Sequence, residues 1–279
     1  MFGLNGGMFD SAASAPASLM QDPAFAAALR LCGQHPRHLP CGLMVLLRQF
    51  LGLQVAMLPR AEPPVDLAAQ LRAVGLHRAP LILSPPRPCP MPPALRLRKP
   101  QSIAILDLIP PQSERRAALH PKWRNQLRRA EEAGLRVTHA PLPPDPNHPL
   151  LLADAAQARR RRYANWPAAL TAAFANTAPA QTRLFTAKRG RKPVAHMLFL
   201  RHERGATYHI GHICTEGKTA HAHNLLLWQA ANWLAEQGHS HLDLGPLHPA
   251  APGLSRFKLR CGAKPQETGG SYLYWRPWA

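Results

Sequence analysis

A glycine and a lysine stand directly ahead of the longest predicted helix of the chain. The segment reads Thr215-Glu-Gly-Lys-Thr219, and the helical pattern continues from Thr219 to Gln237. At a helix N-terminus, free backbone N–H groups and the helix dipole together favour a bound phosphate. Gly217 and Lys218 therefore predict a contact with the phosphates of a substrate, although a plain solvated loop has the same composition.

A second glycine lies inside a predicted strand. Gly211 interrupts the alternating segment from Thr207 to Ile213. Glycine weakens strand pairing and often marks a bulge or a close approach of another backbone. The alternative is a glycine packed under a neighbouring aromatic side chain.

Fifteen histidines and five cysteines raise the question of a metal site. His221 and His223 are two residues apart on the predicted helix and diverge, while His239 and His241 share a strand face but have no third ligand nearby in the sequence. The cysteines are widely spaced and form no CxxC pair, so neither a zinc site nor a disulfide framework is indicated. We expect no metal.

The elements that must position these residues follow from the periodicity of the sequence. Period-two alternation predicts three antiparallel strands ahead of the long helix, at Arg183–Lys188, Val194–Arg201 and Thr207–Ile213. Further elements are predicted before and after them: strands at Ile103–Leu108, Leu135–Thr138, His241–Leu244 and Ser271–Tyr274, and helices at Leu119–Gly134, Leu150–Tyr163 and Leu254–Leu259.

The first hundred residues predict a smaller α/β unit. Residues 1–20 are rich in Gly, Ala and Ser and predict a flexible terminus. Seven prolines between Ser84 and Pro100 predict a linker without regular structure. We therefore divide the chain into residues 1–20, 21–100 and 101–279. Asp22 ahead of Pro23 predicts the N-cap and first turn of a helix at Pro23–Leu31. The other predicted elements within 21–100 are helices at Leu43–Leu51 and Val65–Val74 and strands at Gln54–Leu58 and Leu81–Leu83.

The composition excludes some classes of protein and leaves others open. The 279 residues carry a net charge of +19, of which +14 falls in residues 112–279. Such an excess suits nucleic acid, anionic lipid headgroups or a phosphorylated cofactor, but an arginine-rich genomic composition would also produce it. No apolar run approaches the ~20 residues needed to cross a bilayer. Without a secretory signal ahead of Arg30, we expect a cytoplasmic protein.

Four segments carry a resemblance to a known family. They are Lys122-Trp-Arg-Asn-Gln-Leu-Arg-Arg-Ala-Glu131, Ala222-His-Asn-Leu-Leu-Leu-Trp228, Leu242-Asp-Leu-Gly245 and Gly253-Leu-Ser-Arg-Phe-Lys258. In this order they resemble the Fem-like branch of the GNAT acyltransferase superfamily, which includes peptidyltransferases that add amino acids to peptidoglycan bridges. The resemblance covers about residues 103–275. The usual GNAT phosphate signature, Q/R-x-x-G-x-G/A, is not intact at Thr215–Thr219.

The resemblance implies an α/β protein with a GNAT fold. Its central sheet would be mixed and mostly antiparallel, flanked by helices, and the smaller N-terminal unit would be a degenerate GNAT half. The implied activity is N-acyl transfer (EC 2.3.-) from acetyl-CoA or another acyl-CoA to the primary amine of a small molecule or peptide, by direct attack. One alternative is an aminoacyl-tRNA-dependent Fem-like transferase. Another is a non-catalytic protein of this fold that binds nucleic acid or an anionic membrane.

The resemblance also implies roles for individual residues. A backbone N–H at Gly211 would hold the carbonyl oxygen of the donor. The attacking amine must be neutral, which requires a base, and His209 is favoured over His212; Asp243 is a third candidate unless it only bonds to backbone. The remaining candidates are Lys258 for the acyl group or donor phosphates, Gly217, Lys218, His221 and Asn224 for donor phosphates, and Arg124 and Arg128 for an anionic acceptor, although a solvated helix face also explains these arginines.

Overall fold

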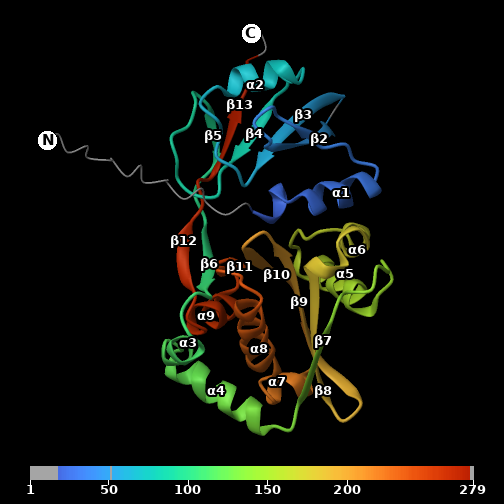
Figure 1. Cartoon of the computed structure of the whole chain (residues 1–279), viewed down its shortest axis with the longest axis vertical. Coiled ribbons are helices and arrows are strands. Elements are labelled where there is room, and N and C mark those ends of the chain that lie inside the picture. The colour runs from blue at the N-terminus through green and yellow to red at the C-terminus, as the bar shows by residue number, and fades with distance from the viewer. Residues whose placement is uncertain (1–17, 51, 277–279) are drawn as a thin grey trace, which may run out of the picture.

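The computed structural model describes residues 18–50 and 52–276. The chain forms two β-sheets, one above the other along the long axis of the molecule (Figure 1). The predicted flexible terminus lies outside the described residues up to position 17. From there the chain enters a short 3-10 helix, Leu19–Gln21, whose Leu19 is buried.

The first sheet has six strands in the order β1-β2-β3-β4-β13-β5. Asp22 caps the helix beneath it, as predicted, by accepting a hydrogen bond from the Ala24 N–H at 2.8 Å. The elements of this unit are β1 (Arg37–His38), β2 (Met44–Phe50), β3 (Leu53–Pro59), β4 (Leu81–Ser84), β5 (Leu95–Arg98), β13 (Ser271–Tyr274), α1 (Pro23–Leu31) and α2 (Leu67–Ala73).

Three predictions about this unit are wrong. The predicted helix Leu43–Leu51 is strand β2, because a short apolar run fits a buried strand as well as a helix and pairing with β3 decides between them. The proline-rich linker contains strand β5. The strand Ser271–Tyr274, expected in the second unit, pairs with β4 and β5 of the first.

The second sheet has seven strands in the order β12-β6-β11-β10-β9-β8-β7. The predicted three-strand meander is confirmed as β8, β9 and β10, while α6 and β12 were not predicted. The elements are β6 (Ser102–Asp107), β7 (Arg136–Ala140), β8 (Thr182–Arg189), β9 (Lys192–His202), β10 (Gly205–Ile213), β11 (His241–Pro246), β12 (Lys264–Glu267), α3 (Gln112–Ala117), α4 (Pro121–Glu132), α5 (Pro149–Arg161), α6 (Ala168–Thr177), the 3-10 helix Pro179–Gln181, α7 (Thr215–Thr219), α8 (Ala222–Glu236) and α9 (Pro252–Arg260).

Apolar side chains cover both faces of the second sheet. On one face, Trp123 of α4 and Leu226 of α8 belong to the largest buried cluster. On the other face, a second cluster joins Phe174 of α6 to Phe25 of α1, and the Phe25 and Trp166 rings stack at 4.8 Å. Helix α1 therefore connects the first unit to the second through a shared apolar core.

The two sheets repeat one topology. Reading β5-β13-β4-β3-β2-β1 against β12-β6-β11-β10-β9-β8 matches each strand with a counterpart. Each sheet contains one parallel pair, β3 with β4 and β10 with β11, joined through a helix. Each pair is extended by an antiparallel strand from a distant part of the chain, β13 in the first sheet and β6 in the second. The architecture is a tandem of two related α/β units, and the prediction of a degenerate second copy is confirmed.

No helix among the described residues is long and apolar enough to span a membrane.

Candidate functional site

Strands β10 and β11 run side by side only where they begin. Gly205–Thr207 pair in parallel with His241–Asp243, and β10 then continues to Ile213 with β9 as its partner. On its other side β11 pairs with β6 as far as Pro246. The two strands therefore separate, and beyond Thr207 no described strand pairs with β10 on the side of β11.

The bulge in β10 lies at His209 and not at Gly211. The register with β9 shifts between Tyr208 and Ile210, whereas Gly211 pairs with Met197. A Cβ atom at Gly211 would collide with the Tyr208 hydroxyl. The glycine therefore makes room for an aromatic side chain, which was the alternative interpretation, and the irregular backbone lies two residues earlier.

Asp243 and Lys258 both lie near the end of β11, where the Asp243 carboxylate influences the Lys258 ammonium. The Asp243 Oδ1 atom accepts a hydrogen bond from the Gly245 N–H at 2.7 Å. Lys258, on α9, is only 4% exposed, and its Nζ atom donates to the Pro246 carbonyl at 3.0 Å. Burial lowers the pKa of Lys258, and the neighbouring Asp243 carboxylate opposes that shift. A buried ammonium with a depressed pKa can stabilise negative charge that develops on a nearby oxygen.

His209 belongs to a different environment. Its Nε2 atom shares a hydrogen bond with the Thr171 hydroxyl of α6 at 3.0 Å, and its ring lies edge-on to Trp166 at 4.8 Å. Burial lowers the pKa of His209 to about 4, so the imidazole is neutral near pH 7. Among the contacts of the described residues, none joins His209 to Asp243 or Lys258.

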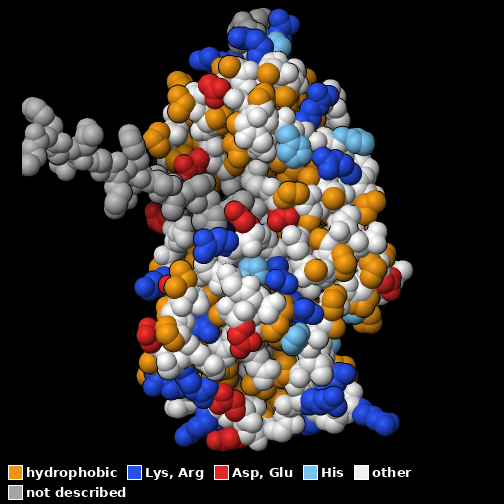
Figure 2. Space-filling model, in the orientation of Figure 1, with side chains coloured by type: hydrophobic (Ala, Val, Ile, Leu, Met, Phe, Trp, Pro, Cys, Tyr) orange, Lys and Arg blue, Asp and Glu red, His pale blue; other side chains and the backbone are white. Residues whose placement is uncertain are grey.

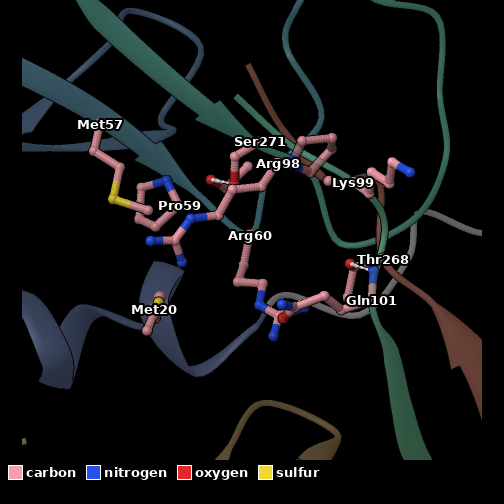
Figure 3. A pocket seen from close by; sticks show the side chains of 12 residues that line it. Met20, Met57, Pro59, Arg60, Arg98, Lys99, Gln101, Thr268 and Ser271 are labelled. Carbon is pink, nitrogen blue, oxygen red and sulfur yellow. Dashed lines mark hydrogen bonds between the residues drawn. The ribbon is translucent and has the colours of Figure 1, made fainter. Parts of the chain in front are cut away.

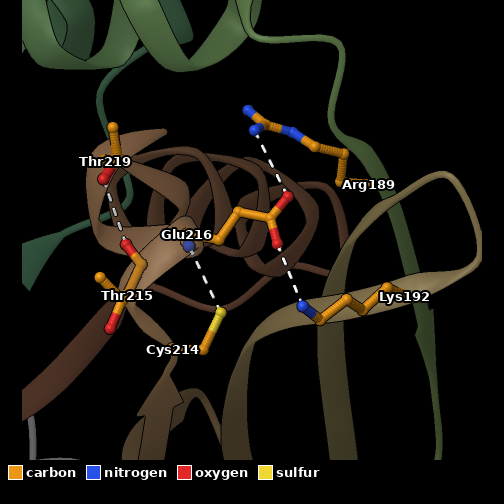
Figure 4. A network of polar contacts seen from close by, with 7 residues as sticks. Arg189, Lys192, Cys214, Thr215, Glu216 and Thr219 are labelled. Atoms are coloured by element: carbon orange, nitrogen blue, oxygen red, sulfur yellow. Dashed lines mark hydrogen bonds and ion pairs between the residues drawn. The ribbon is translucent and has the colours of Figure 1, made fainter.

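The connection from β10 to the long helix is a helix of its own, α7. Its first turn is capped by Cys214, whose Sγ accepts from the Gly217 N–H at 3.5 Å. Glu216 forms ion pairs with Arg189 at 3.4 Å and Lys192 at 3.3 Å (Figure 4). A Cβ at Gly217 would clash with the Val194 carbonyl. At Gly217 the glycine allows close packing, and the Glu216 carboxylate lies at the start of the helix, where a phosphate contact was predicted.

The other predicted phosphate contacts are not gathered at one point. Lys218 is exposed on α7. His221 has a left-handed backbone (φ 50°) ahead of α8. Asn224 is only 5% exposed, and its Nδ2 atom faces the Gln126 Oε1 of α4 at 3.5 Å. Asn224 therefore lies apart from the α7 helix start, on the side of α8 that meets α4.

Helices α4, α8 and α9 enclose a hollow of about 270 Å³. Trp123, Gln126 and Asn224 line it together with Phe257, and Arg256, Arg260 and Gly253 complete its wall. Arg256 and Arg260 were not singled out from the sequence, although the segment Gly253–Lys258 marked this region. Here two aromatic rings, two amides and two cations come together.

The two arginines predicted to hold an acceptor differ in their surroundings. Arg124 donates through Nη2 to the carbonyls of Ala117 at 2.8 Å and Leu119 at 3.0 Å, so it secures the end of α3. Arg128 is exposed on α4. Lys and Arg side chains gather on this end of the molecule, over α4 and the turn of β8 and β9 (Figure 2).

Several histidines lie close together without forming a metal site. His212 pairs with His196 across β10 and β9, and His223 Nε2 donates to the His212 carbonyl at 3.1 Å. Burial lowers the pKa of both His196 and His223 to about 4. Among the described residues, no group of three or more His, Cys, Asp or Glu side chains could hold a metal ion.

Comparison with known proteins shows which proteins this architecture resembles. Residues 117–259 match the sequence model of the acetyltransferase (GNAT) domain. The crystal structure of FemX has a TM-score of 0.71 at 12% identity and covers 94% of this chain and 93% of its own. A conserved protein of unknown function from Bacteroides thetaiotaomicron VPI-5482 reaches 0.63 at 15% identity, covering 92% and 91%. L-PGS from Bacillus licheniformis reaches 0.55 at 13% identity, covering 94% of each chain. No protein of curated function matches the sequence.

Proposed function

The chain belongs to the GNAT acetyltransferase-domain family, and from this premise we propose that it transfers an aminoacyl group from aminoacyl-tRNA to an amine. The tandem GNAT-like architecture and the membership of an acyl-transferring family are compatible with either donor. The choice between acyl-CoA and aminoacyl-tRNA depends on where the phosphates of the donor can bind.

The single observation that carries the choice is the ion-paired helix α7. In the GNAT fold the donor's diphosphate would sit on the connection between β10 and α8. Here Glu216 places a carboxylate at that point and is held by Arg189 and Lys192, while the Gly217 N–H already donates to Cys214. A diphosphate would meet a negative charge and an engaged donor, so this connection disfavours acyl-CoA.

The hollow between α4, α8 and α9 offers the three kinds of contact that the end of a tRNA requires: an aromatic face, amide groups and cations. The partly exposed Phe257 ring offers a face on which a base can stack, and Gln126 and Asn224 offer amide donors and acceptors. Arg256 and Arg260, which also line the hollow, offer two cations for the adjoining phosphates. The Fem-like resemblance of the sequence supports an aminoacyl-tRNA donor, as does the likeness to FemX over 94% of the chain.

The reaction is acyl transfer from an ester to an amine. The acceptor nitrogen attacks the ester carbonyl, the carbonyl oxygen becomes an oxyanion, and the ester C–O bond then breaks. The ribose oxygen leaves and takes up a proton, and the amine nitrogen loses one. We assign the Lys258 ammonium to stabilising the oxyanion beside the separated strands, with Asp243 holding the strand end. His209 was predicted as the base. Because Thr171 engages its imidazole, we assign it a positioning role on β10 instead.

The test combines binding and turnover. Filter binding should retain aminoacyl-tRNA with a steep salt dependence, and Arg256→Ala or Arg260→Ala should each lower the slope of log K against log[salt] by about one. Arg72→Ala, on α2 of the first unit, removes one exposed charge as a matched control and should change neither the slope nor turnover. Radiolabelled aminoacyl groups should pass from tRNA to acid-soluble amines.

Either of two results contradicts the proposal. If the protein releases thiol from acetyl-CoA in a pool of amines and leaves charged tRNA intact, then acyl-CoA is the donor. If charged tRNA binds without any transfer, in the presence of the same amines, the protein is a binding module of this fold.

A further inference from the structure

Two arginines stack on one tryptophan near the C-terminal end of α8. The Cζ atom of Arg183 lies 4.5 Å from the centroid of the Trp233 ring, and that of Arg201 lies 5.2 Å from it. Arg183 belongs to β8 and Arg201 to the end of β9. Arg183 pairs with Phe199, two residues before Arg201. Side chains alternate along a strand, so both guanidinium groups come from the same face of the sheet.

No carboxylate compensates these two guanidinium groups. None of the ion pairs among the described residues involves Arg183 or Arg201. Burial lowers the pKa of Arg201, and the positive charge of Arg183 lowers it further. The same two causes lower the pKa of His139, whose ring centroid lies 5.4 Å from that of Trp233. Like charges held together in a partly buried place disfavour one another, and an anion between them removes that cost.

The two guanidinium groups differ in how they are held. Arg201 donates through Nε to the Nε2 atom of His239 at 2.8 Å and through Nη1 to the Ala180 carbonyl at 3.1 Å, so its position is fixed. Arg183 has a buried Nε atom without a hydrogen-bond partner among the described residues. A buried donor that donates to nothing destabilises the folded chain, and a ligand that accepts from it reverses this.

A second arginine–tryptophan stack in the same unit is built differently. The Arg116 Cζ atom lies 5.6 Å from the centroid of the Trp228 ring. Its two Nη atoms donate to the Glu131 carboxylate at 2.8 and 2.7 Å. The chain therefore supplies its own anion at Trp228, where one cation stacks, and supplies none at Trp233, where two cations stack.

We propose that Arg183 and Arg201 bind the phosphate group of a soluble ligand against the Trp233 ring. A phosphate monoester carries a charge of about −1.5 to −2 near pH 7, which matches two guanidinium groups better than one carboxylate does. Its oxygens can accept from both groups, and the planar fork of arginine suits bidentate binding of phosphate. The inference goes beyond the proposed function and requires no acyl transfer.

The cluster is separate from the hollow between α4, α8 and α9, since none of its residues lines that hollow. It is also separate from a hollow of about 180 Å³ where the two units meet, which Arg60, Arg98 and Thr268 line with others (Figure 3). A signal from Trp233 therefore reports on this cluster and not on either hollow.

Phosphate binding can be followed by nuclear magnetic resonance at the indole N–H of Trp233, in the full-length protein made with isotope-labelled tryptophan. The chain has six tryptophans, and the variants Trp233→Phe and Trp228→Phe assign the two signals of interest. Titration with inorganic phosphate, at an ionic strength held constant with sodium chloride, should shift the Trp233 signal and leave that of Trp228 in place. Arg183→Ala and Arg201→Ala should each weaken binding by about tenfold or more. Arg72→Ala removes one exposed charge on α2 and should bind as the wild type does.

The outcomes separate this inference from its alternatives and from the proposed function. A Trp233 signal that millimolar phosphate leaves unchanged overturns the phosphate site, as does equal weakening by Arg72→Ala, and the wild-type titration decides even if an arginine variant does not fold. An equal shift with acetate assigns the site to carboxylates instead. A shift with tRNA but not with phosphate overturns a small ligand in favour of a nucleic acid. Phosphate binding that depends on both arginines, in a protein that transfers no aminoacyl group, retains this site and removes the proposed function.

Discussion

The Tyr208 hydroxyl occupies the space in which a side chain at Gly211 would lie. The two residues are three positions apart on β10, with the bulge between them. The Tyr208 side chain lies over Gly211 of the same strand. Burial raises the pKa of Tyr208, so the phenol remains protonated. The shape of the open edge of β10 therefore depends on this pair.

Substitution of Gly211 by alanine should destabilise the protein. The added methyl group meets the Tyr208 hydroxyl, and overpacking in a well-packed region typically lowers the free energy of unfolding by about 1–3 kcal/mol. Urea denaturation measures the change. The double variant Gly211→Ala with Tyr208→Phe removes the hydroxyl and should recover part of the loss. Equal stability of the single and double variants would show that the hydroxyl is not the obstacle.

Replacement of Lys258 by methionine should abolish most of the turnover while leaving tRNA binding intact. Loss of one donor to an oxyanion lowers kcat by about 100- to 1,000-fold, and methionine fills the buried space. Because burial lowers the pKa of Lys258, wild-type activity should fall on the alkaline side at a pH below that of an ordinary lysine. Lys258→Arg should shift that limb upward. A pH profile unchanged by this variant would separate Lys258 from the reaction.

Acid should destabilise the protein through its buried histidines. Burial lowers the pKa of His209 to about 4, whereas an unfolded chain has a histidine pKa near 6.5. Between these values the unfolded state binds the proton and the folded state does not, so the free energy of unfolding falls as the pH falls from about 6.5 to about 4. Chemical denaturation across this range should show the slope.

The contribution of His209 can be isolated within that slope. His209→Gln keeps a partner for Thr171 but cannot titrate, so it should flatten the pH dependence. His35→Gln, an exposed histidine of the first unit, serves as the control and should leave it unchanged. A His209→Gln profile as steep as the wild type would mean that other histidines account for the slope.

Replacement of Glu216 by glutamine should alter anion binding more than stability. Its ion pairs with Arg189 and Lys192 are partly exposed, and such pairs contribute about 0–1 kcal/mol. Removing the carboxylate frees two cations at the start of α7, so binding of coenzyme A should strengthen, as measured by calorimetry. No gain in affinity would show that Glu216 is not what disfavours this donor.

The sequence predicted most clearly those elements whose pattern is local. Period-two alternation identified β8, β9 and β10, and Asp22 with Pro23 marked the start of α1. Local signals were ambiguous at β2, where an apolar run suits either kind of element until pairing decides. Pairing between strands far apart could not be predicted at all, since Ser84 and Ser271, whose strands pair, are 187 residues apart.

The candidate site was also predicted only in part, because some of its residues carry a local sequence signal and others do not. The segment ending in Lys258 pointed to a residue that the structure buries beside the end of β11. The surroundings of Gly217 and Lys218 could not be predicted, because a glycine ahead of a helix has the same sequence signature whether it binds an anion or permits close packing. The hollow lined by Arg60, Arg98 and Thr268 had no local signal in the sequence, since its lining comes from five separate segments.

Strand β13 follows the second unit in the chain but belongs to the first sheet, and this bears on how the chain folds while it is synthesised. Strand β4 gains its neighbour β13 only when residues 271–274 have left the ribosome. At about 5–20 residues per second, the nascent first sheet waits roughly 10–40 s with the edge of β4 unpaired. An open strand edge invites pairing with another chain. Residues 271–274 are thus needed to complete the first sheet, and a nascent chain that stalls before them would expose an unpaired strand edge.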